Sequence, residues 1–246
     1  LSAGFVMEEG FAMDDLKRII ASMSKAAAEA GVNIVTGDTK VVEKGNVDGI
    51  YINTAGIGII QEGVDISGAN ARPGQDIILS GPLGDHSMAV MSERHGLKLP
   101  EAVVSDCAPL NGLIQNILQR VPQVAVLRDP TRGGLATTLN EIADQSNVGI
   151  MLDEGSIPVN PAVKAACDIL GFDPLYLANE GKTVVFVEKT FTEEVLKIMH
   201  AHPYGKEARV IGRVSAQPAG KVGLKTCVGG IRLLDMLTGD QLPRIC

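Results

Sequence analysis

The sequence predicts an α/β (α+β) protein, in which helices alternate with short aliphatic strands. Between Ala12 and Ala30, apolar side chains recur at the spacing of a helix that buries one face. The run Val184-Val185-Phe186 has the composition of a buried strand. Aromatic residues make up only 3% of the 246 residues and Trp is absent, so Val, Ile, Leu, Ala and Met must fill the interior, as in sheets that are covered on both faces.

The first 64 residues predict one helix among three strands. Asp14 and Asp15 favour a helix N-terminus because they complement the helix dipole, and Gly31 is typical of a helix end. Because position 1 is Leu and already belongs to a strand pattern, we expect a further N-terminal portion to precede it, which makes this domain incomplete. The predicted elements are a strand at Leu1–Met7, a helix at Ala12–Ala30, a short strand at Val32–Val35 ended by Thr36-Gly37-Asp38, and a longer strand at Gly49–Ile60.

A polar, turn-rich stretch from Glu62 to Gly74 indicates a domain boundary. We expect a remaining part of an N-terminal domain at 1–64, an α/β domain at 74–235, and a mobile tail at 236–246 that carries the terminal cysteine. In the second domain we predict strands at Asp76–Ser80, Val124–Leu127, Gly149–Leu152, Thr183–Glu188 and Ala208–Val214, and helices at Ser87–His95, Leu110–Arg120, Leu135–Gln145, Pro161–Leu170 and Thr192–Ala201.

Composition excludes several classes of protein. The net charge is −7, and no basic run interleaves with aromatic residues, so nucleic acid is not an expected partner. No apolar stretch approaches the roughly 18 residues that span a bilayer, and no signal segment is recognisable. We therefore expect a cytoplasmic protein that does not bind a membrane. The four cysteines are scattered, which predicts neither a disulfide framework nor a zinc cluster.

Asp38 stands in the segment Thr36-Gly37-Asp38-Thr39-Lys40, directly after a predicted strand. The ends of strands are where α/β proteins place ligand-binding groups, and a carboxylate there can coordinate Mg²⁺ carried by a nucleotide phosphate. The alternative is a tight turn in which Asp and Gly serve the backbone only.

The segment Asp129-Pro130-Thr131-Arg132-Gly133-Gly134 leads from a strand into a helix. Free backbone N–H groups, a guanidinium group and a carboxylate then meet at a helix N-terminus, which is typical of a phosphate and metal site. The alternative is a helix cap formed by Asp or Thr, with glycines for a sharp turn.

Glu180 precedes a strongly apolar strand, where partial burial would raise its pKa and suit it to proton transfer; the alternative is a turn. We interpret His86 as a helix cap, and Cys107 and Cys167 as buried thiols. Cys246 is the last residue, and a thiol on a terminal tail can serve as a covalent carrier that moves between sites. The alternative is an incidental terminal cysteine.

Together these segments resemble the HypE family of hydrogenase maturation factors. That family belongs to a superfamily with aminoimidazole ribonucleotide synthetase, selenophosphate synthetase and thiamine-monophosphate kinase. The resemblance implies a two-domain PurM-like fold and a homodimer in the full-length protein. It rests on Thr36-Gly-Asp-Thr-Lys40, Asn53-Thr-Ala-Gly56, Ser80-Gly-Pro-Leu-Gly-Asp-His86, Ser105-Asp-Cys107, Asp129-Pro-Thr-Arg-Gly-Gly134, Ala178-Asn-Glu-Gly-Lys182 and Pro243-Arg-Ile-Cys246.

The resemblance also implies a reaction. A partner enzyme, HypF, places a carbamoyl group on the terminal thiol, here Cys246, and ATP-dependent dehydration of the resulting thiocarboxamide gives a thiocyanate. A HypC–HypD complex then receives the cyanide for the iron of [NiFe]-hydrogenase. In this picture Asp38 and Asp129 bind Mg²⁺, and Lys40 and Glu180 handle the amide protons and its orientation. The predicted residues for binding ATP are Asp38, Thr39, Asp129, Thr131, Arg132, Gly133 and Gly134.

Two other functions stay open at this point. One is a small-molecule kinase of the same superfamily, whose activity would be indifferent to loss of Cys246. The other is a truncated module that binds partner proteins and performs no chemistry.

Overall fold

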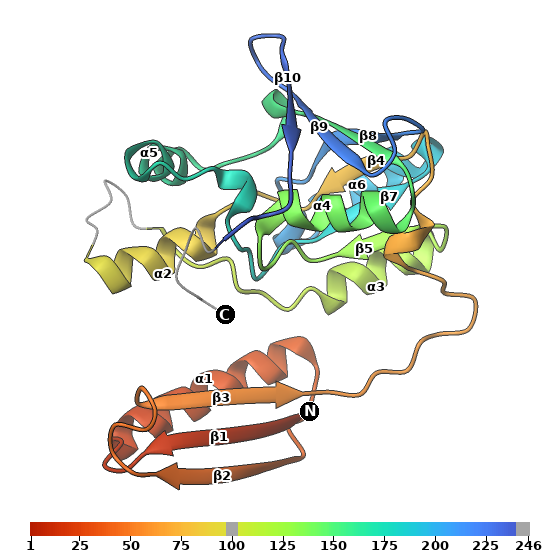
Figure 1. Ribbon diagram of the computed structural model, residues 1–246. Coiled ribbons are helices and arrows are strands. Elements are labelled where there is room, and N and C mark those ends of the chain that lie inside the picture. Colours follow the sequence, from red (N-terminus) through yellow and green to blue (C-terminus); the bar gives the residue numbers. More distant parts are fainter. Residues whose placement is uncertain (97–102, 240–246) are drawn as a thin grey trace. The chain divides into compact units, whose positions relative to one another are not determined.

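The computed structural model describes residues 1–96 and 103–239. The chain divides into two compact units, Leu1–Val64 and Asp65–Cys246, each with its own internal packing (Figure 1). The mixed α and β content confirms the predicted fold class.

The first unit is a three-stranded sheet with one helix. Strand β1 (Ser2–Glu8) lies between β2 (Thr36–Val42), to which it runs parallel, and β3 (Ile50–Ala55), to which it runs antiparallel. Helix α1 (Met13–Ala30) connects the two parallel strands and covers one face of the sheet (Figure 1). Gly31, with a φ of 66°, ends the helix as predicted.

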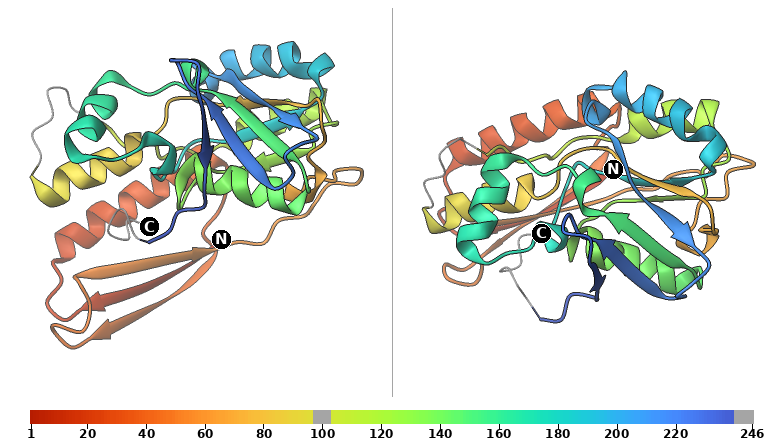
Figure 2. Two further views of the ribbon diagram at one scale, coloured as in Figure 1. Left: turned by 45° about the horizontal axis from the view of Figure 1, so that its top comes forward. Right: turned by 90° about the horizontal axis from the view of Figure 1, so that it is seen from above.

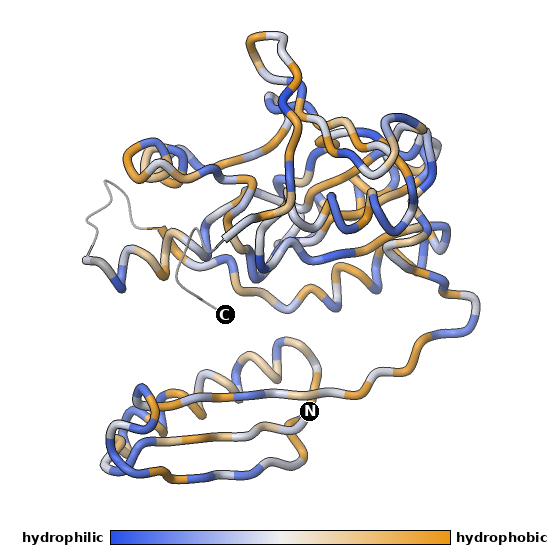
Figure 3. The backbone as a smooth tube through the Cα atoms, viewed as in Figure 1, coloured by the Kyte–Doolittle hydropathy of each residue, from blue (hydrophilic) through white to orange (hydrophobic). Residues whose placement is uncertain are grey.

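Strand pairing explains where two sequence predictions were wrong. The strand expected at 32–35 begins instead at Thr36, and the strand expected to reach residue 60 ends at Ala55. Both ends are set by β1, because Ser2 pairs with Thr36 on one side and with Ala55 on the other. Residues 32–35 and 56–60 therefore lack a partner strand, and Ile57 and Ile59 are exposed in a stretch that Figure 3 colours partly orange.

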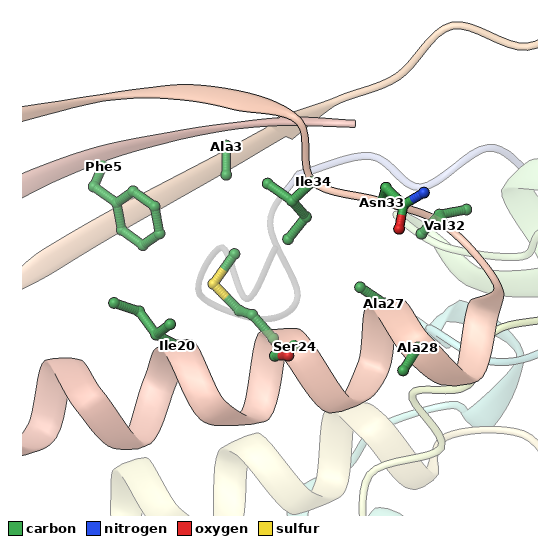
Figure 4. A pocket seen from close by; sticks show the side chains of 10 residues that line it. Ala3, Phe5, Ile20, Ser24, Ala27, Ala28, Val32, Asn33 and Ile34 are labelled. Carbon is green, nitrogen blue, oxygen red and sulfur yellow. The ribbon is translucent and has the colours of Figure 1, made fainter.

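The first unit buries little apolar surface. Of its residues, all of which are described, only Ala3 and Met7 are buried. A cavity of about 460 Å³ separates α1 from the sheet, and Figure 4 shows Phe5, Ile20 and Ile34 turned towards it. The helix of this unit thus has an apolar face without close packing.

The second unit is built on a seven-stranded sheet of order β10-β9-β6-β8-β4-β7-β5. All neighbouring pairs are antiparallel except β6 with β9. Its strands are β4 (Asp76–Leu79), β5 (Val126–Arg128), β6 (Gly149–Asp153), β7 (Val184–Val187), β8 (Arg209–Ser215), β9 (Lys221–Lys225) and β10 (Ile231–Leu234). Its α-helices are α2 (Asp85–His95), α3 (Asn111–Arg120), α4 (Gly134–Gln145), α5 (Pro161–Leu170) and α6 (Thr192–His200). Short 3-10 turns occur at Gly68–Asn70, Glu154–Ser156, Pro174–Tyr176, Lys189–Phe191 and Pro203–Gly205.

Both faces of this sheet are covered, which explains the unbroken apolar runs in its central strands. In β4, Ile77 and Leu79 pack in one core with α4, whereas Ile78 packs in a second core with α3 and α6. In β7, Phe186 belongs to the first core and Val185 to the second. Successive residues of a strand point to opposite faces, so a strand that is buried on both sides must be apolar throughout. Figure 2 shows helices on both sides of the sheet.

The predicted helices and strands of this unit are confirmed to within one or two residues, except that β9 and β10 were missed. Strand β9 is short and contains Gly223, so only Val222 and Leu224 mark it as apolar. No described helix is long and apolar enough to cross a membrane.

We expect Leu139→Ala to lower the free energy of unfolding of the second unit by about 2–5 kcal/mol, because it leaves a cavity in a closely packed core. Leu139 is fully buried on α4 and packs against the sheet. Leu139→Met, which conserves volume, is the control and should cost less than about 1.5 kcal/mol. Chemical denaturation measures both values, and equal losses for the two variants would contradict this packing.

Candidate active site

The loop between β5 and α4 forms a helix N-terminus without a side-chain cap. The cap residue is Gly133, with a φ of 78°, and no side chain among the described residues caps the first turn. The reading of this segment as an Asp or Thr cap is therefore wrong. Gly134 has a φ of 63° and its N–H donates to the carbonyl of Thr131 at 2.8 Å, which closes the turn. The remaining N–H groups of the first helical turn are open to an anion.

A cavity of about 520 Å³ lies at this helix N-terminus. Arg128, Thr131, Arg132, Gly133 and Thr137 line it together with Glu141, Leu237 and Gly239. Arg128 forms ion pairs with Glu141 at 3.3 Å and with Asp129 at 3.9 Å. The Asp129 side chain is 61% exposed, so its oxygens are accessible to a cation. The cavity thus combines helix N–H groups, hydroxyl groups and guanidinium groups, which suits a phosphate group.

The Glu180 segment is tied to this loop by a fully buried amide. The Asn179 side chain donates from Nδ2 to the carbonyl of Pro130 at 3.0 Å and to that of Leu177 at 2.9 Å. Its Oδ1 accepts from the backbone N–H of Gly84 at 2.8 Å. Asn179 therefore fixes the start of α2, the β5–α4 loop and the Glu180 segment relative to one another.

Glu180 lies half-buried in a bend before β7, so the segment is turn-like, as the alternative held, and its carboxyl group is also partly removed from solvent. Burial raises the pKa of its carboxyl group above the ordinary value, as the sequence predicted, while the charge of His86 opposes the shift and the charges of Asp106 and Asp129 add to it. Its Oε1 is buried and has no hydrogen-bond partner among the described residues. The structure therefore brings Glu180 and Asp129 into one electrostatic environment.

A buried ion pair holds the backbone beside Glu180. Lys182 Nζ lies 3.1 Å from Asp106 Oδ2, and the two side chains are 12% and 2% exposed. Asp106 Oδ1 accepts the backbone N–H of Glu180 at 3.0 Å. A Cβ at Gly181 would collide with the backbone carbonyl of Asp106, so only glycine permits this close approach. Asp106 and Lys182 were missed as site residues because their partners are distant in sequence.

His86 and Cys107 differ from their predictions. His86 does not cap α2, whose cap residue is Gly84; its Nδ1 lies 2.9 Å from Ser105 Oγ and 3.7 Å from Cys107 Sγ. Cys107 is exposed rather than buried, because residues 103–110 form a loop instead of a helix. Cys167 is buried as predicted, and burial raises the pKa of its thiol to about 11.

Asp38, Thr39 and Lys40 lie in the first unit, within β2 rather than in a turn after a strand. The turn alternative is therefore wrong, and so is the expected position at a strand end, because Asp38 pairs with Gly4 and Lys40 with Val6 in the sheet. Residues two apart in a strand share a face, so Asp38 and Lys40 project on one side and Thr39 on the other. All three are exposed, and Asp38 Oδ1 accepts the N–H of Thr39 at 2.8 Å.

The predicted carrier thiol of Cys246 lies outside the described residues, which end at Gly239. The segment that leads to it is anchored on the second unit. Asn140 Nδ2 donates to the carbonyl of Leu234 at 2.9 Å, and the Tyr176 hydroxyl donates to that of Asp235 at 3.0 Å. The N–H of Leu237 then donates to Thr137 Oγ1 at 3.3 Å, so the chain enters the cavity at the start of α4.

Comparisons with protein-family models identify the general class of this chain. The family model "AIR synthase related protein, C-terminal domain" matches residues 72–225, and the corresponding N-terminal model matches residues 1–60. The chain thus has the two domains of an AIR synthase-related protein.

Individual relatives identify the family to which the chain belongs within this class. Carbamoyl dehydratase HypE of Cupriavidus necator is 54% identical over all 246 residues, which cover 70% of that protein. A crystal structure of hydrogenase maturation protein HypE in complex with ATP is 49% identical with a TM-score of 0.95, and the match covers all of this chain and 74% of that one. A HypE–HypF complex is 51% identical with a TM-score of 0.92, covering 96% and 77%. The chain belongs to the HypE family of carbamoyl dehydratases.

We expect Gly134→Ala to destabilise the second unit more than Gly171→Ala. Both glycines have positive φ, which costs an alanine about 1–2 kcal/mol. A Cβ at Gly134 would also lie 2.5 Å from the carbonyl oxygen of Leu175, whereas Gly171 has open space around it. We therefore expect about 1–2 kcal/mol for Gly171→Ala and about 3–5 kcal/mol for Gly134→Ala by denaturant unfolding. Equal losses would show that the Gly134 loop yields to the added methyl group.

We expect Glu180→Gln to become more stable relative to the wild type as the pH rises. The folded state raises the pKa of Glu180, so the folded protein holds this proton more tightly than the unfolded chain does. The proton on Glu180 therefore stabilises the folded protein fully below the ordinary carboxyl pKa. This stabilisation is lost as the pH rises through the raised pKa of the folded state. Unfolding from pH 4 to pH 8 measures the difference, with the exposed Glu93→Gln as control. A difference between Glu180→Gln and wild type that does not change with pH would contradict the burial effect.

Proposed function

We propose that the chain catalyses ATP-dependent dehydration of a carbamoyl group, carried as a thiocarboxamide on Cys246, to a thiocyanate. The cyano group is destined for the iron of [NiFe]-hydrogenase. The observation that carries the proposal is the position of Glu180, a carboxyl group with a raised pKa in the same electrostatic environment as Asp129, at the loop that opens the α4 N-terminus. Membership of the HypE family supports the same reaction.

The chemistry needs a phosphate site and a base in one place. An amide oxygen is a poor leaving group, but transfer of a phosphoryl group from ATP to that oxygen lets it depart as phosphate. The N–H group of Gly133, the guanidinium group of Arg132 and the hydroxyl of Thr131 would hold the phosphate, whereas the N–H of Gly134 is engaged in the turn and Gly134 serves its shape. Glu180 would take a proton from the amide nitrogen, a role for which a carboxyl group of raised pKa is suited.

The first unit would supply further nucleotide contacts. Asp38 and Thr39 are exposed on β2 and offer oxygen atoms to a nucleotide with its metal ion. Lys40 shares a face with Asp38 and carries three N–H donors. We assign Lys40 to orientation of the carbamoyl group through its oxygen.

Asp129 in the second unit and Asp38 in the first each offer an exposed carboxylate, the kind of donor that Mg²⁺ prefers. The described residues contain no group of three or more His, Cys, Asp or Glu side chains that could hold a metal ion. Mg²⁺ does not need such a cluster, because it commonly binds through one or two carboxylates together with substrate phosphates and water. When bound, the ion would neutralise charge on the transferred phosphoryl group.

The partners follow from the carrier chemistry. We propose that HypF delivers the carbamoyl group, that a HypC–HypD complex receives the cyanide, and that the chain acts as a homodimer in the cytoplasm. A HypE–HypF crystal structure at 51% identity supports the first of these partners. A thiol on a terminal segment suits successive partners, because one linker can present it at different sites.

Mass spectrometry of the protein after incubation with HypF, carbamoyl phosphate and ATP tests the proposal. We expect a carbamoyl group on the peptide that contains Cys246, followed by loss of water in the presence of ATP. Cys246→Ala should abolish both signals, whereas Cys227→Ala, at an exposed thiol outside the site, should retain them. Full thiocyanate formation by Cys246→Ala would refute the carrier role. Phosphorylation of a free small molecule that is indifferent to this substitution would favour a kinase instead.

A further inference from the structure

The carboxylate of Asp106 uses its two oxygens for different contacts. Oδ1 accepts the backbone N–H of Glu180 at 3.0 Å, and Oδ2 lies 3.1 Å from Nζ of Lys182. The Asp106 side chain is 2% exposed, so both contacts form away from water. Only the contact through Oδ1 reaches the residue that carries the candidate base.

The loop that contains Asp106 touches the Glu180 segment at two consecutive residues. Asp106 precedes Glu180 by 74 residues in the sequence and binds its N–H. The backbone carbonyl of Asp106 also lies so close to Gly181 that no side chain fits between them. A displacement of Asp106 must therefore move Glu180 with it.

The carboxyl group of Glu180 depends on its backbone for its position. Its Oε1 is buried and has no hydrogen-bond partner among the residues that the structure describes. The backbone on either side is held by the buried amide of Asn179 and by Asp106. A base that is held in place before the substrate arrives loses less entropy in the reaction, so these contacts bear on its rate.

The hydrogen bond to Glu180 and the ion pair with Lys182 make different demands on Asp106. A backbone N–H is a neutral donor, and the oxygen of a side-chain amide can accept it as a carboxylate oxygen does. The ammonium group of Lys182, whose side chain is 12% exposed, instead requires a countercharge. The acceptor at Oδ1 thus serves Glu180, and the negative charge serves Lys182.

We propose that Asp106 is a positioning residue for Glu180, and that it acts through Oδ1 as a hydrogen-bond acceptor while Lys182 balances its charge. The inference rests on the proposed function, in which Glu180 takes a proton from the carbamoyl group. It adds to that function the side chain that holds the base in place, and it separates the role of the acceptor from that of the charge.

The two charges should accordingly be dispensable together but not singly. Removal of one partner leaves the other as a buried, unpaired charge, whereas joint replacement of a buried pair by neutral residues of similar volume is often tolerated. Asp106→Asn/Lys182→Met keeps an oxygen acceptor for the N–H of Glu180. Asp106→Leu/Lys182→Met has a side chain of similar size at position 106 but no acceptor.

Mass spectrometry of Cys246 with HypF, carbamoyl phosphate and ATP tests the inference in the wild-type protein and these variants. All should acquire the carbamoyl group at the wild-type rate. The rate constant for loss of water should stay within about threefold of wild type in Asp106→Asn/Lys182→Met, because a neutral acceptor is weaker than a charged one. It should fall by about 10-fold or more in Asp106→Leu/Lys182→Met, which lacks the hydrogen bond, with an unchanged KM for ATP. Lys182→Met alone should be slower than Asp106→Asn/Lys182→Met.

The matched control is a second buried carboxylate that forms an ion pair. The Asp76 side chain is 6% exposed, lies 2.8 Å from Nε of Arg213 and accepts the hydroxyl of Thr192 at 2.8 Å. Asp76 stands at the start of β4, whereas the site is built where β4 has ended and α2 begins. Asp76→Asn/Arg213→Met should therefore dehydrate its carbamoyl group at the wild-type rate.

The outcomes separate this inference from the proposed function. If the wild-type protein does not dehydrate its carbamoyl group, the proposed function itself fails. If wild type and the control dehydrate it and the Asn and Leu double variants have equal rate constants, the acceptor at position 106 does not position Glu180. A raised KM for ATP with an unchanged kcat in the Leu double variant would likewise overturn the inference.

Denaturant unfolding establishes which variants are folded under the assay conditions. If Asp106→Leu/Lys182→Met is not folded, the comparison of Lys182→Met with Asp106→Asn/Lys182→Met still decides the question. The inference requires the double variant to dehydrate its carbamoyl group faster than the single variant. A double variant as slow as Lys182→Met would show that the charge of the pair is needed, and would overturn it.

Discussion

The side-chain amide of Asn179 is the interaction on which the candidate site depends. It is fully buried, and its three hydrogen bonds join the start of α2, the β5–α4 loop and the segment before β7. These segments carry, respectively, His86, Asp129 and Glu180. Because a buried amide that loses a partner leaves a polar group unsatisfied, the network tolerates little displacement. One buried side chain thus holds together the loop proposed to bind phosphate and the segment that carries the proposed base.

The ion pair of Asp106 and Lys182 shows why such a site is costly to build. Removing two charges from water carries a penalty that their mutual attraction only partly repays. This pair also positions the backbone, because Asp106 accepts the N–H of Glu180 and the backbone of Asp106 lies against Gly181. Burial raises the pKa of Asp85 as well, and the charge of Lys182 opposes that shift. Lys182 thus pairs with Asp106 and opposes the shift at Asp85, whereas Glu180 Oε1 is buried without a hydrogen-bond partner among the described residues.

Sequence reasoning predicted what depends on local pattern. The helix that begins at Gly134, the strand after Lys182 and the raised pKa of Glu180 follow from periodicity, glycine chemistry and the apolar strand beside the carboxylate. It failed where the answer depends on contacts between distant residues. The strand at Thr36 is set by its pairing with Ser2, and the roles of His86 and Cys107 depend on a loop that folds back on α2. No local pattern distinguishes a histidine that caps a helix from one that contacts a serine 19 residues away.

The number of residues between Gly239 and Cys246 limits how far the thiol of Cys246, the proposed carrier, can reach. Gly239 lines the cavity at the α4 N-terminus, and Cys246 follows it by seven residues (246 − 239). An extended chain spans at most about 3.6 Å per residue, so the thiol reaches no farther than about 25 Å from that cavity. The bonds of Asn140, Tyr176 and Thr137 to residues 234–237 fix the start of this span on the second unit itself. The proposed reaction of the Cys246 thiol at the α4 N-terminus is therefore compatible with an intact sheet.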